Sequence, residues 1–170
     1  MGYDLPAALG AAIADKRNKN SRIICFAGDG SLQMNIQELQ TLSSLNLNIK
    51  IFLLNNDGYL SIKSTHKNFF GTVFGSHPKS GIDFPNFAKV SKAYCINSYK
   101  ISTYEGLKKL PNILEKKEPA LIELMINTDQ EFCPKIKSRI DEKGNFITPE
   151  LDDMFPFLSK KDLLKIKQGL

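Results

Sequence analysis

Hydrophobic positions fall into short continuous runs, and between these runs apolar residues recur every three or four positions. Continuous runs at 22–27, 49–54 and 120–126 have the length and composition of strands buried on both faces, and 96–101 is a fourth candidate strand. Helical spacing is expected at 5–17, 35–45, 84–95 and 103–117, where Pro111 interrupts the last segment. This alternation predicts an α/β fold, a doubly wound and mainly parallel sheet with helices on both faces.

The pattern changes after Asn127, where the chain contains three prolines and only one late helical stretch. We therefore expect a domain at 1–128 and a C-terminal extension at 129–170 that packs on the domain or on a partner. The first residues already read as a helix, which indicates a piece of a longer protein.

Composition narrows the classes of protein. The chain has 170 residues, 42% of them hydrophobic and 24% charged, which is ordinary for one globular domain. No apolar run approaches the roughly 18–20 residues that span a bilayer, so no membrane partner is expected. The net charge of +5 is dispersed, without a basic face interleaved with aromatic residues, so no nucleic-acid partner is expected. Three widely spaced cysteines without a CxxC pair indicate reduced thiols and a cytoplasmic location.

An acid between two glycines marks the first candidate site, in FAGDGSLQMNIQEL at 26–39. Asp29 follows one predicted strand, and Asn55 and Asn56 follow the next. Because the carboxyl ends of parallel strands meet at one edge of a sheet, Asp29 and Asn56 are expected to lie close together. Carboxylate and amide oxygens suit Mg²⁺ or Ca²⁺, and two side chains leave room for phosphate and water ligands.

Small residues around Asp29 indicate a binding site for an anion. Gly28, Gly30 and Ser31 precede a predicted helix, where backbone N–H groups can approach a phosphate. The dinucleotide pattern GxGxxG fails because Gln33 stands at its third glycine, and no Walker P-loop pattern is present. The segment therefore predicts a diphosphate bridged by a divalent cation. Asp29 taken alone is better explained as a turn or cap residue, and only the joint pattern favours a ligand site.

These residues resemble a known family. GDGS, a helix and a buried strand ending in NN are similar to the C-terminal, diphosphate-binding domain of thiamine-diphosphate enzymes, in particular the acetolactate synthase-like group. The resemblance rests on MGYDLPAALGAAIA, GDGSLQMNIQEL and IKIFLLNNDGYLSI, and on the tail CPKIKSR with PELDDMFPFL. It covers most of the chain and implies the thiamine-diphosphate-binding fold.

The resemblance implies roles for individual residues. Asp29, Asn56 and the Gly58 carbonyl match the ligands of Mg²⁺. Met1 matches an apolar residue that supports the bent cofactor. The remaining expected contacts to thiamine diphosphate are made by Gly28, Gly30, Ser31, Asn56, Gly58, Tyr59 and Leu60.

The resemblance also implies a function. The chain would be the diphosphate and Mg²⁺ part of a thiamine-diphosphate-dependent 2-keto acid decarboxylase or carboligase, a lyase or transferase. A pyrimidine-binding domain, upstream or on another subunit, would supply the glutamate that acts on the cofactor, within a homodimer or other homo-oligomer. No catalytic residue is assigned to this chain, which is expected to be inactive alone.

The chain departs from the family pattern at one point, and two alternatives stay open. True acetolactate synthases have a tryptophan soon after NN, whereas this chain has none and reads GYLSIKSTHKNFFG. Lys63, Thr65 and His66 are candidates for the substrate side of the site. The first alternative is a non-catalytic cofactor-binding or regulatory module of the same fold. The second is a nucleotide or flavin binder, against which the absent GxGxxG weighs.

Overall fold

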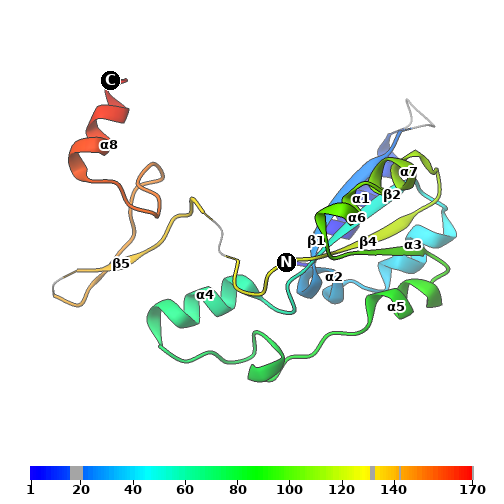
Figure 1. The fold of residues 1–170 in the computed structure, drawn as a ribbon, viewed down its shortest axis with the longest axis horizontal. Coiled ribbons are helices and arrows are strands. Elements are labelled where there is room, and N and C mark those ends of the chain that lie inside the picture. The colour runs from blue at the N-terminus through cyan, green and yellow to red at the C-terminus, as the bar shows by residue number, and fades with distance from the viewer. Residues whose placement is uncertain (16–20, 131–132, 142, 170) are drawn as a thin grey trace. The chain divides into compact units, whose positions relative to one another are not determined.

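The computed structural model describes residues 1–15, 21–130, 133–141 and 143–169. They form two compact units, Met1–Gln130 and Glu131–Leu170. The first unit contains a four-stranded sheet in the order β1-β2-β4-β3, in which every neighbouring pair is parallel (Figure 1). Its strands are β1 (Ile23–Gly28), β2 (Ile49–Asn55), β3 (Asn97–Ile101) and β4 (Ala120–Met125).

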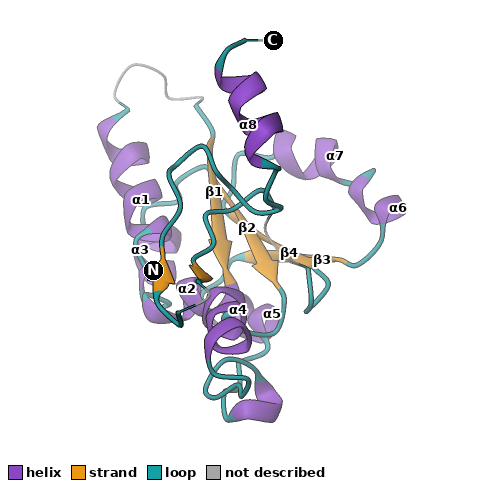
Figure 2. Cartoon of the chain, turned by 90° about the vertical axis from the view of Figure 1, so that its left-hand side faces the viewer, coloured by secondary structure: helices purple, strands orange, loops and turns teal. Residues whose placement is uncertain are grey.

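Helices cover both faces of this sheet. The larger core cluster joins one face to residues of α1 (Asp4–Ala14), α2 (Asp29–Met34), α3 (Glu38–Ser44) and α5 (Phe87–Ala93). The smaller cluster joins the other face to α7 (Leu110–Glu115), which follows α6 (Tyr104–Leu107). Figure 2 shows α1 and α3 on one side of the sheet and α6 and α7 on the other. The predicted doubly wound α/β fold is confirmed.

The continuous apolar runs arise because the central strands bury both faces. Ile51 and Leu53 of β2 point into the larger cluster, whereas Phe52 between them belongs to the smaller one. In β4, Leu121 and Ile122 divide between the two clusters in the same way. Alternation of side chains along a strand thus produces an unbroken hydrophobic sequence.

Two expected helices differ in the structure, one in where it begins and one because it is divided. The segment 35–45 was expected to be helical from its first residue, but α2 ends at Met34 and α3 begins only at Glu38. The backbone of Asn35 leaves the helical conformation, with φ of −130° and ψ of 39°, and its side chain donates a hydrogen bond to the Gly2 carbonyl. The segment 103–117 divides into α6 and α7, and Pro111 lies in the first turn of α7, where a missing N–H costs nothing.

Other expected elements differ at their ends or were not foreseen. The helix expected at 5–17 ends at Ala14, and positions 16–17 lie outside the described residues. Helix α4 (Leu60–Phe69) was not expected, and it follows directly on the NNDGY segment. A short 3₁₀ helix, Pro78–Ser80, lies between α4 and α5.

The second unit contains a two-residue antiparallel pair, β5 (Arg139–Ile140) with β6 (Phe146–Ile147), and the expected late helix, α8 (Lys160–Lys167). The Ser159 hydroxyl caps α8 by accepting a hydrogen bond from Asp162 N. The division at 128/129 and the packing of the extension on the domain or a partner remain predictions. None of the helices in the described ranges has the length and hydropathy needed to span a membrane.

Candidate functional site

The centre of the site is a buried carboxylate at the carboxyl edge of the sheet. Asp29 is the first residue of α2, directly after β1, and it is 1% exposed. Its Oδ1 accepts a hydrogen bond from Gly30 N at 2.6 Å, and its Oδ2 accepts from Asn56 N at 3.2 Å and Gly58 N at 3.0 Å. The loop after β1 and the loop after β2 therefore meet, as expected for neighbouring parallel strands.

Backbone N–H groups, and not a cationic side chain among the described residues, stabilise the negative charge of Asp29. Burial raises the pKa of its carboxyl group, and backbone N–H groups of Gly58, Gly30 and Asn56 oppose that rise. Within the described residues, Asp29 forms no ion pair with a lysine or arginine. A buried carboxylate of this kind gains most from a bound cation, because the cation offsets the cost of desolvating the charge.

The two consecutive asparagines have different surroundings. Asn55 uses both ends of its amide, since Nδ2 donates to Glu123 Oε1 at 2.7 Å and Oδ1 accepts from Asp57 N at 3.0 Å. The Asn56 side chain makes no hydrogen bond with any residue that the structure describes. Asn56 is therefore the asparagine whose amide oxygen is free to bind a ligand.

The Gly58 carbonyl is likewise free of hydrogen bonds from the described part of the chain. The Gly58 N–H is bound to Asp29, so the nitrogen side of this residue is fixed. The oxygens at this corner thus include the Asp29 carboxylate, which accepts three backbone N–H groups, and two oxygens without a hydrogen bond from the described residues, the Asn56 amide oxygen and the Gly58 carbonyl. No group of three or more His, Cys, Asp or Glu side chains in the described ranges could hold a metal, so a cation here would need this mixed set of oxygens. Hard oxygen donors of this kind suit Mg²⁺ or Ca²⁺.

At Gly30 and Gly58, neighbouring atoms lie so close to the backbone that a side chain would clash with them. A Cβ on Gly30 would lie 2.0 Å from Tyr59 Cε1, because the Tyr59 ring packs over the start of α2. A Cβ on Gly58 would lie 2.2 Å from the Ser76 carbonyl oxygen, to which the adjacent Tyr59 N donates at 2.7 Å. Gly28, at the end of β1, has open space around it. Gly30 and Gly58 therefore let the two loops and the 76–80 segment pack closely.

The N-terminal residues lie beside α2. Gly2 N donates a hydrogen bond to the Ser31 hydroxyl at 2.7 Å, so Ser31 and the residues next to Gly2 belong to the same corner of the site. Met1 is 74% exposed there. Its expected role as a support for the cofactor remains a prediction.

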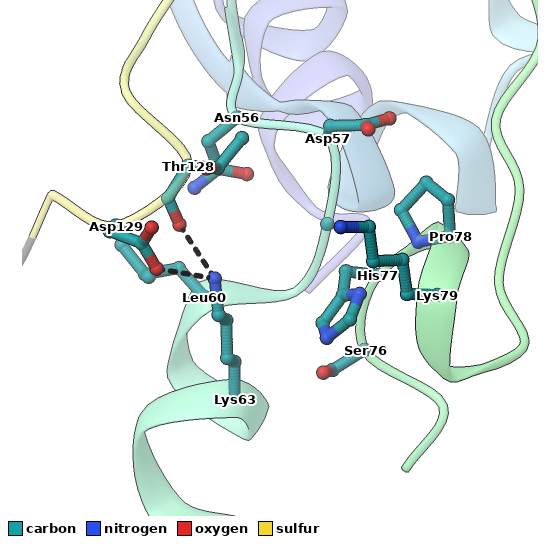
Figure 3. Close-up of a pocket in the computed structure, with 11 residues that line it drawn as sticks. Asn56, Asp57, Leu60, Lys63, Ser76, His77, Pro78, Lys79, Thr128 and Asp129 are labelled. Atoms are coloured by element: carbon teal, nitrogen blue, oxygen red, sulfur yellow. Dashed lines mark hydrogen bonds and ion pairs between the residues drawn. The ribbon is translucent and has the colours of Figure 1, made fainter. Parts of the chain in front are cut away.

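A cavity of about 270 Å³ is lined in part by Asn56, Asp57 and Gly58 (Figure 3). Of the residues expected to bind the cofactor, Asn56, Gly58 and Leu60 line it, whereas Asp29, Gly30, Ser31 and Tyr59 do not. Lys63 lines the cavity, and its Nζ donates to the Thr128 carbonyl at 3.0 Å and to Asp129 Oδ1 at 2.7 Å. This lysine connects the start of α4 to the segment that follows β4.

Some functional features were not foreseen. The sequence could have drawn attention to Glu123, because a charged residue inside the apolar run ALIELMI is unusual, but nothing in the sequence paired it with Asn55. Nothing in the sequence drew attention to Ser76. It is fully buried and lines the cavity, and its hydroxyl has no hydrogen-bond partner among the described residues. Its position depends on a loop 18 residues beyond Gly58, which periodicity does not reach.

Comparisons with known proteins agree on one family. Residues 1–124 match the model "Thiamine pyrophosphate enzyme, C-terminal TPP binding domain". The acetolactate synthase large subunit of Cyanidium caldarium is 36% identical over 137 residues, which are 80% of this chain and 23% of that protein. The isozyme 1 large subunit of acetolactate synthase from Escherichia coli is 32% identical over 139 residues, 80% of this chain and 24% of that protein.

A solved structure is also similar. The Rhodococcus jostii thiamine diphosphate-dependent 4-hydroxybenzoylformate decarboxylase aligns with a TM-score of 0.64 and 28% identity, over 77% of this chain and 24% of that one. The chain thus spans about a quarter of the length of the proteins it matches.

Proposed function

Because this chain belongs to the family of thiamine pyrophosphate enzyme C-terminal, TPP-binding domains, we propose that it forms the cation and diphosphate half of an active site. The observation that carries the proposal is the buried Asp29 carboxylate, which holds the Asn56–Gly58 turn while the Asn56 amide stays free. The whole enzyme would be a 2-keto acid decarboxylase or carboligase, a lyase or transferase.

Each residue at the corner has a proposed task. The Asp29 carboxylate, the Asn56 amide oxygen and the Gly58 carbonyl would bind Mg²⁺, which in turn would bind the diphosphate of thiamine diphosphate. Gly28, Gly30 and Ser31 would contact that diphosphate through the start of α2, with Met1, Tyr59 and Leu60 around the cofactor. When bound, thiamine diphosphate supplies the nucleophilic carbon and accepts the electrons released on decarboxylation, and the chain binds and orients it.

The rest of the active site would come from outside these 170 residues. We propose a pyrimidine-binding domain on the same polypeptide or on another subunit, within a homo-oligomer. No carboxylate of this chain is assigned to the pyrimidine ring, so the isolated chain is expected to be inactive. The three cysteines are free, which supports a reducing compartment such as the cytoplasm.

Titration calorimetry tests the assignment. We expect the chain to bind thiamine diphosphate with Mg²⁺ and not with EDTA, and to bind neither NAD nor FMN. Asp29→Ala and Asn56→Ala should abolish the Mg²⁺-dependent binding. The matched control is Asp57→Asn, which changes an exposed acid in the same loop and keeps a residue type that tolerates the positive φ of 59°. Unchanged affinity in Asp29→Ala would contradict the proposed site.

A second experiment concerns turnover. Decarboxylation of a 2-keto acid should be absent with this chain alone and should appear when a pyrimidine-binding domain is added in cis or in trans. Cofactor binding without turnover in that complete assembly would favour the alternative, a non-catalytic or regulatory module.

A further inference from the structure

Glu123 is a buried acid in the interior strand β4, and its side chain contacts the loop that carries the candidate cation site. It is 7% exposed, and it lies on the same face of the sheet as Leu121 of the larger core. Strand β4 lies beside β2, with Glu123 in register with Leu53, so its side chain reaches Asn55 two residues further along. The closest ammonium is Lys100 Nζ at 4.0 Å, on a side chain that is 58% exposed, so that ion pair is weak.

The hydrogen bond to Glu123 fixes the orientation of the Asn55 amide. Glu123 Oε1 accepts the hydrogen bond from Asn55 Nδ2, so the Asn55 NH₂ group faces Glu123. The amide oxygen then faces the other way, where it accepts the Asp57 N–H. With the amide reversed, an oxygen would face a carboxylate and an NH₂ group would face an N–H donor, and both hydrogen bonds would be lost.

This arrangement completes the support of the turn after β2. The N–H groups of Asn56 and Gly58 are bound by Asp29 Oδ2, and the N–H group of Asp57 between them is bound by Asn55 Oδ1. Asp57 has a φ of 59°, a left-handed conformation that costs free energy in any residue with a Cβ. Three consecutive N–H groups are thus held by side-chain oxygens. Asp29 accepts from Asn56 N and Gly58 N, and Asn55, itself bound to Glu123, accepts from Asp57 N, which also interacts weakly with the Asp29 carboxylate.

We infer that Glu123 is a positioning residue for the cation. Through Asn55 it holds the Asn56–Asp57 peptide, which joins the Asn56 ligand to the residue before Gly58, while Asp29 holds the Gly58 N–H and the Gly58 carbonyl stays free of hydrogen bonds from the described residues. The inference rests on the proposed function, because it concerns the ligands assigned there to Mg²⁺. Residues that orient metal ligands in this indirect way commonly change metal affinity by about 10–100-fold when they are replaced.

The test exchanges donor and acceptor between the two residues. Glu123→Gln removes the requirement for one amide orientation, and Asn55→Asp places two carboxylates against each other. The double variant Asn55→Asp/Glu123→Gln restores the pair with reversed polarity. In it, the NH₂ group of the introduced glutamine can donate to one oxygen of the introduced aspartate while the other oxygen accepts the Asp57 N–H. The double variant also has the same net charge as the original chain.

Two readouts are measured on the full chain. Hydrogen exchange of the Asp57 amide, without ligand, should be about tenfold faster in each single variant and close to the original rate in the double variant. The affinity for Mn²⁺ with thiamine diphosphate should fall about tenfold in Glu123→Gln and largely recover in the double variant. Asp57→Asn is the charge control, since it removes a negative charge from the loop itself and keeps the Asn55–Glu123 pair.

The outcomes separate this inference from the proposed function. Unchanged exchange of the Asp57 amide in both single variants overturns the inference whether or not the cofactor binds. Faster exchange with unaltered Mn²⁺ affinity overturns it too, because Glu123 would then stabilise the loop without serving the cation. An equal loss of affinity in Asp57→Asn would mean that charge alone acts. If the original chain binds no Mn²⁺ with thiamine diphosphate, the proposed function fails, and the positioning of a cation ligand fails with it.

Discussion

At the scale of single residues, two side chains of the same type can differ in the hydrogen bonds that their neighbours leave available. Asn55 and Asn56 are identical and adjacent, yet the Asn55 side chain is hydrogen-bonded at both ends of its amide, whereas the Asn56 side chain is free of partners in the described part of the chain. The meeting of Asp29 with the Asn56 loop could be predicted, because it follows from the topology of any parallel sheet. Which asparagine is free could not be derived from the residues alone, because it depends on Glu123, 68 positions away.

Gly58 gives a prediction at this scale. Gly58→Ala would place a Cβ 2.2 Å from the Ser76 carbonyl oxygen, a backbone atom that cannot move without displacing the 76–80 segment. We expect the free energy of unfolding to fall by about 1–3 kcal/mol, as in other overpacked sites. Urea denaturation measures it.

The matched control is Gly28→Ala, at the end of β1, where no atom of the described chain lies within 4 Å of the added Cβ. This control should stay within about 0.5 kcal/mol of the original stability. Equal stability of the two variants would show that the contact between the NNDG loop and Ser76 is not tight.

At the scale of elements, strands were predicted more accurately than helices. Buried strands show themselves as continuous apolar runs, because both of their faces enter a core. Helix α4 was missed because LSIKSTHKNF is mostly polar, with no residue of α4 buried. Polar contacts tie it down instead, among them those of Lys63 with Thr128 and Asp129, at a sequence separation that no local pattern encodes.

Strand β2 supplies a second prediction, at its end remote from the site. Lys50 is fully buried there, and its Nζ donates to Asn48 Oδ1 at 2.9 Å and to the Glu118 carbonyl. Burial lowers the pKa of Lys50 below its usual 10.5, and Arg22 lowers that pKa further. Just below pH 10.5 the unfolded chain therefore binds more protons than the folded one, so stability should rise as the pH rises through this window.

Lys50→Met removes that contribution. We expect the free energy of unfolding, measured in urea between about pH 7 and 10, to rise less steeply in this variant than in the original chain. The exposed Lys92→Met is the control and should keep the original slope. Binding of thiamine diphosphate should not change, because Lys50 pairs with Ala120 at the amino end of the sheet. Identical slopes in all three proteins would contradict the prediction.

At the scale of the whole molecule, both hydrophobic clusters lie within Met1–Gln130. Every buried residue of the two clusters falls between Leu5 and Ile122. The residues assigned to the cation and the diphosphate also lie in this unit, together with the Lys63 contacts to Thr128 and Asp129. A hydrophobic core is what allows part of a chain to fold independently.

A truncation tests this independence. We expect residues 1–130 to unfold cooperatively, with a thermal midpoint close to that of the full chain, and to bind thiamine diphosphate with Mg²⁺ as the full chain does. The control is 1–119, which lacks β4 and so removes the strand between β2 and β3. That fragment should not fold, because β3 would lose its partner strand and both clusters would lose residues such as Leu121 and Ile122. If 1–130 also failed to fold, residues 131–170 would be part of what stabilises the sheet, and the cofactor site would depend on them.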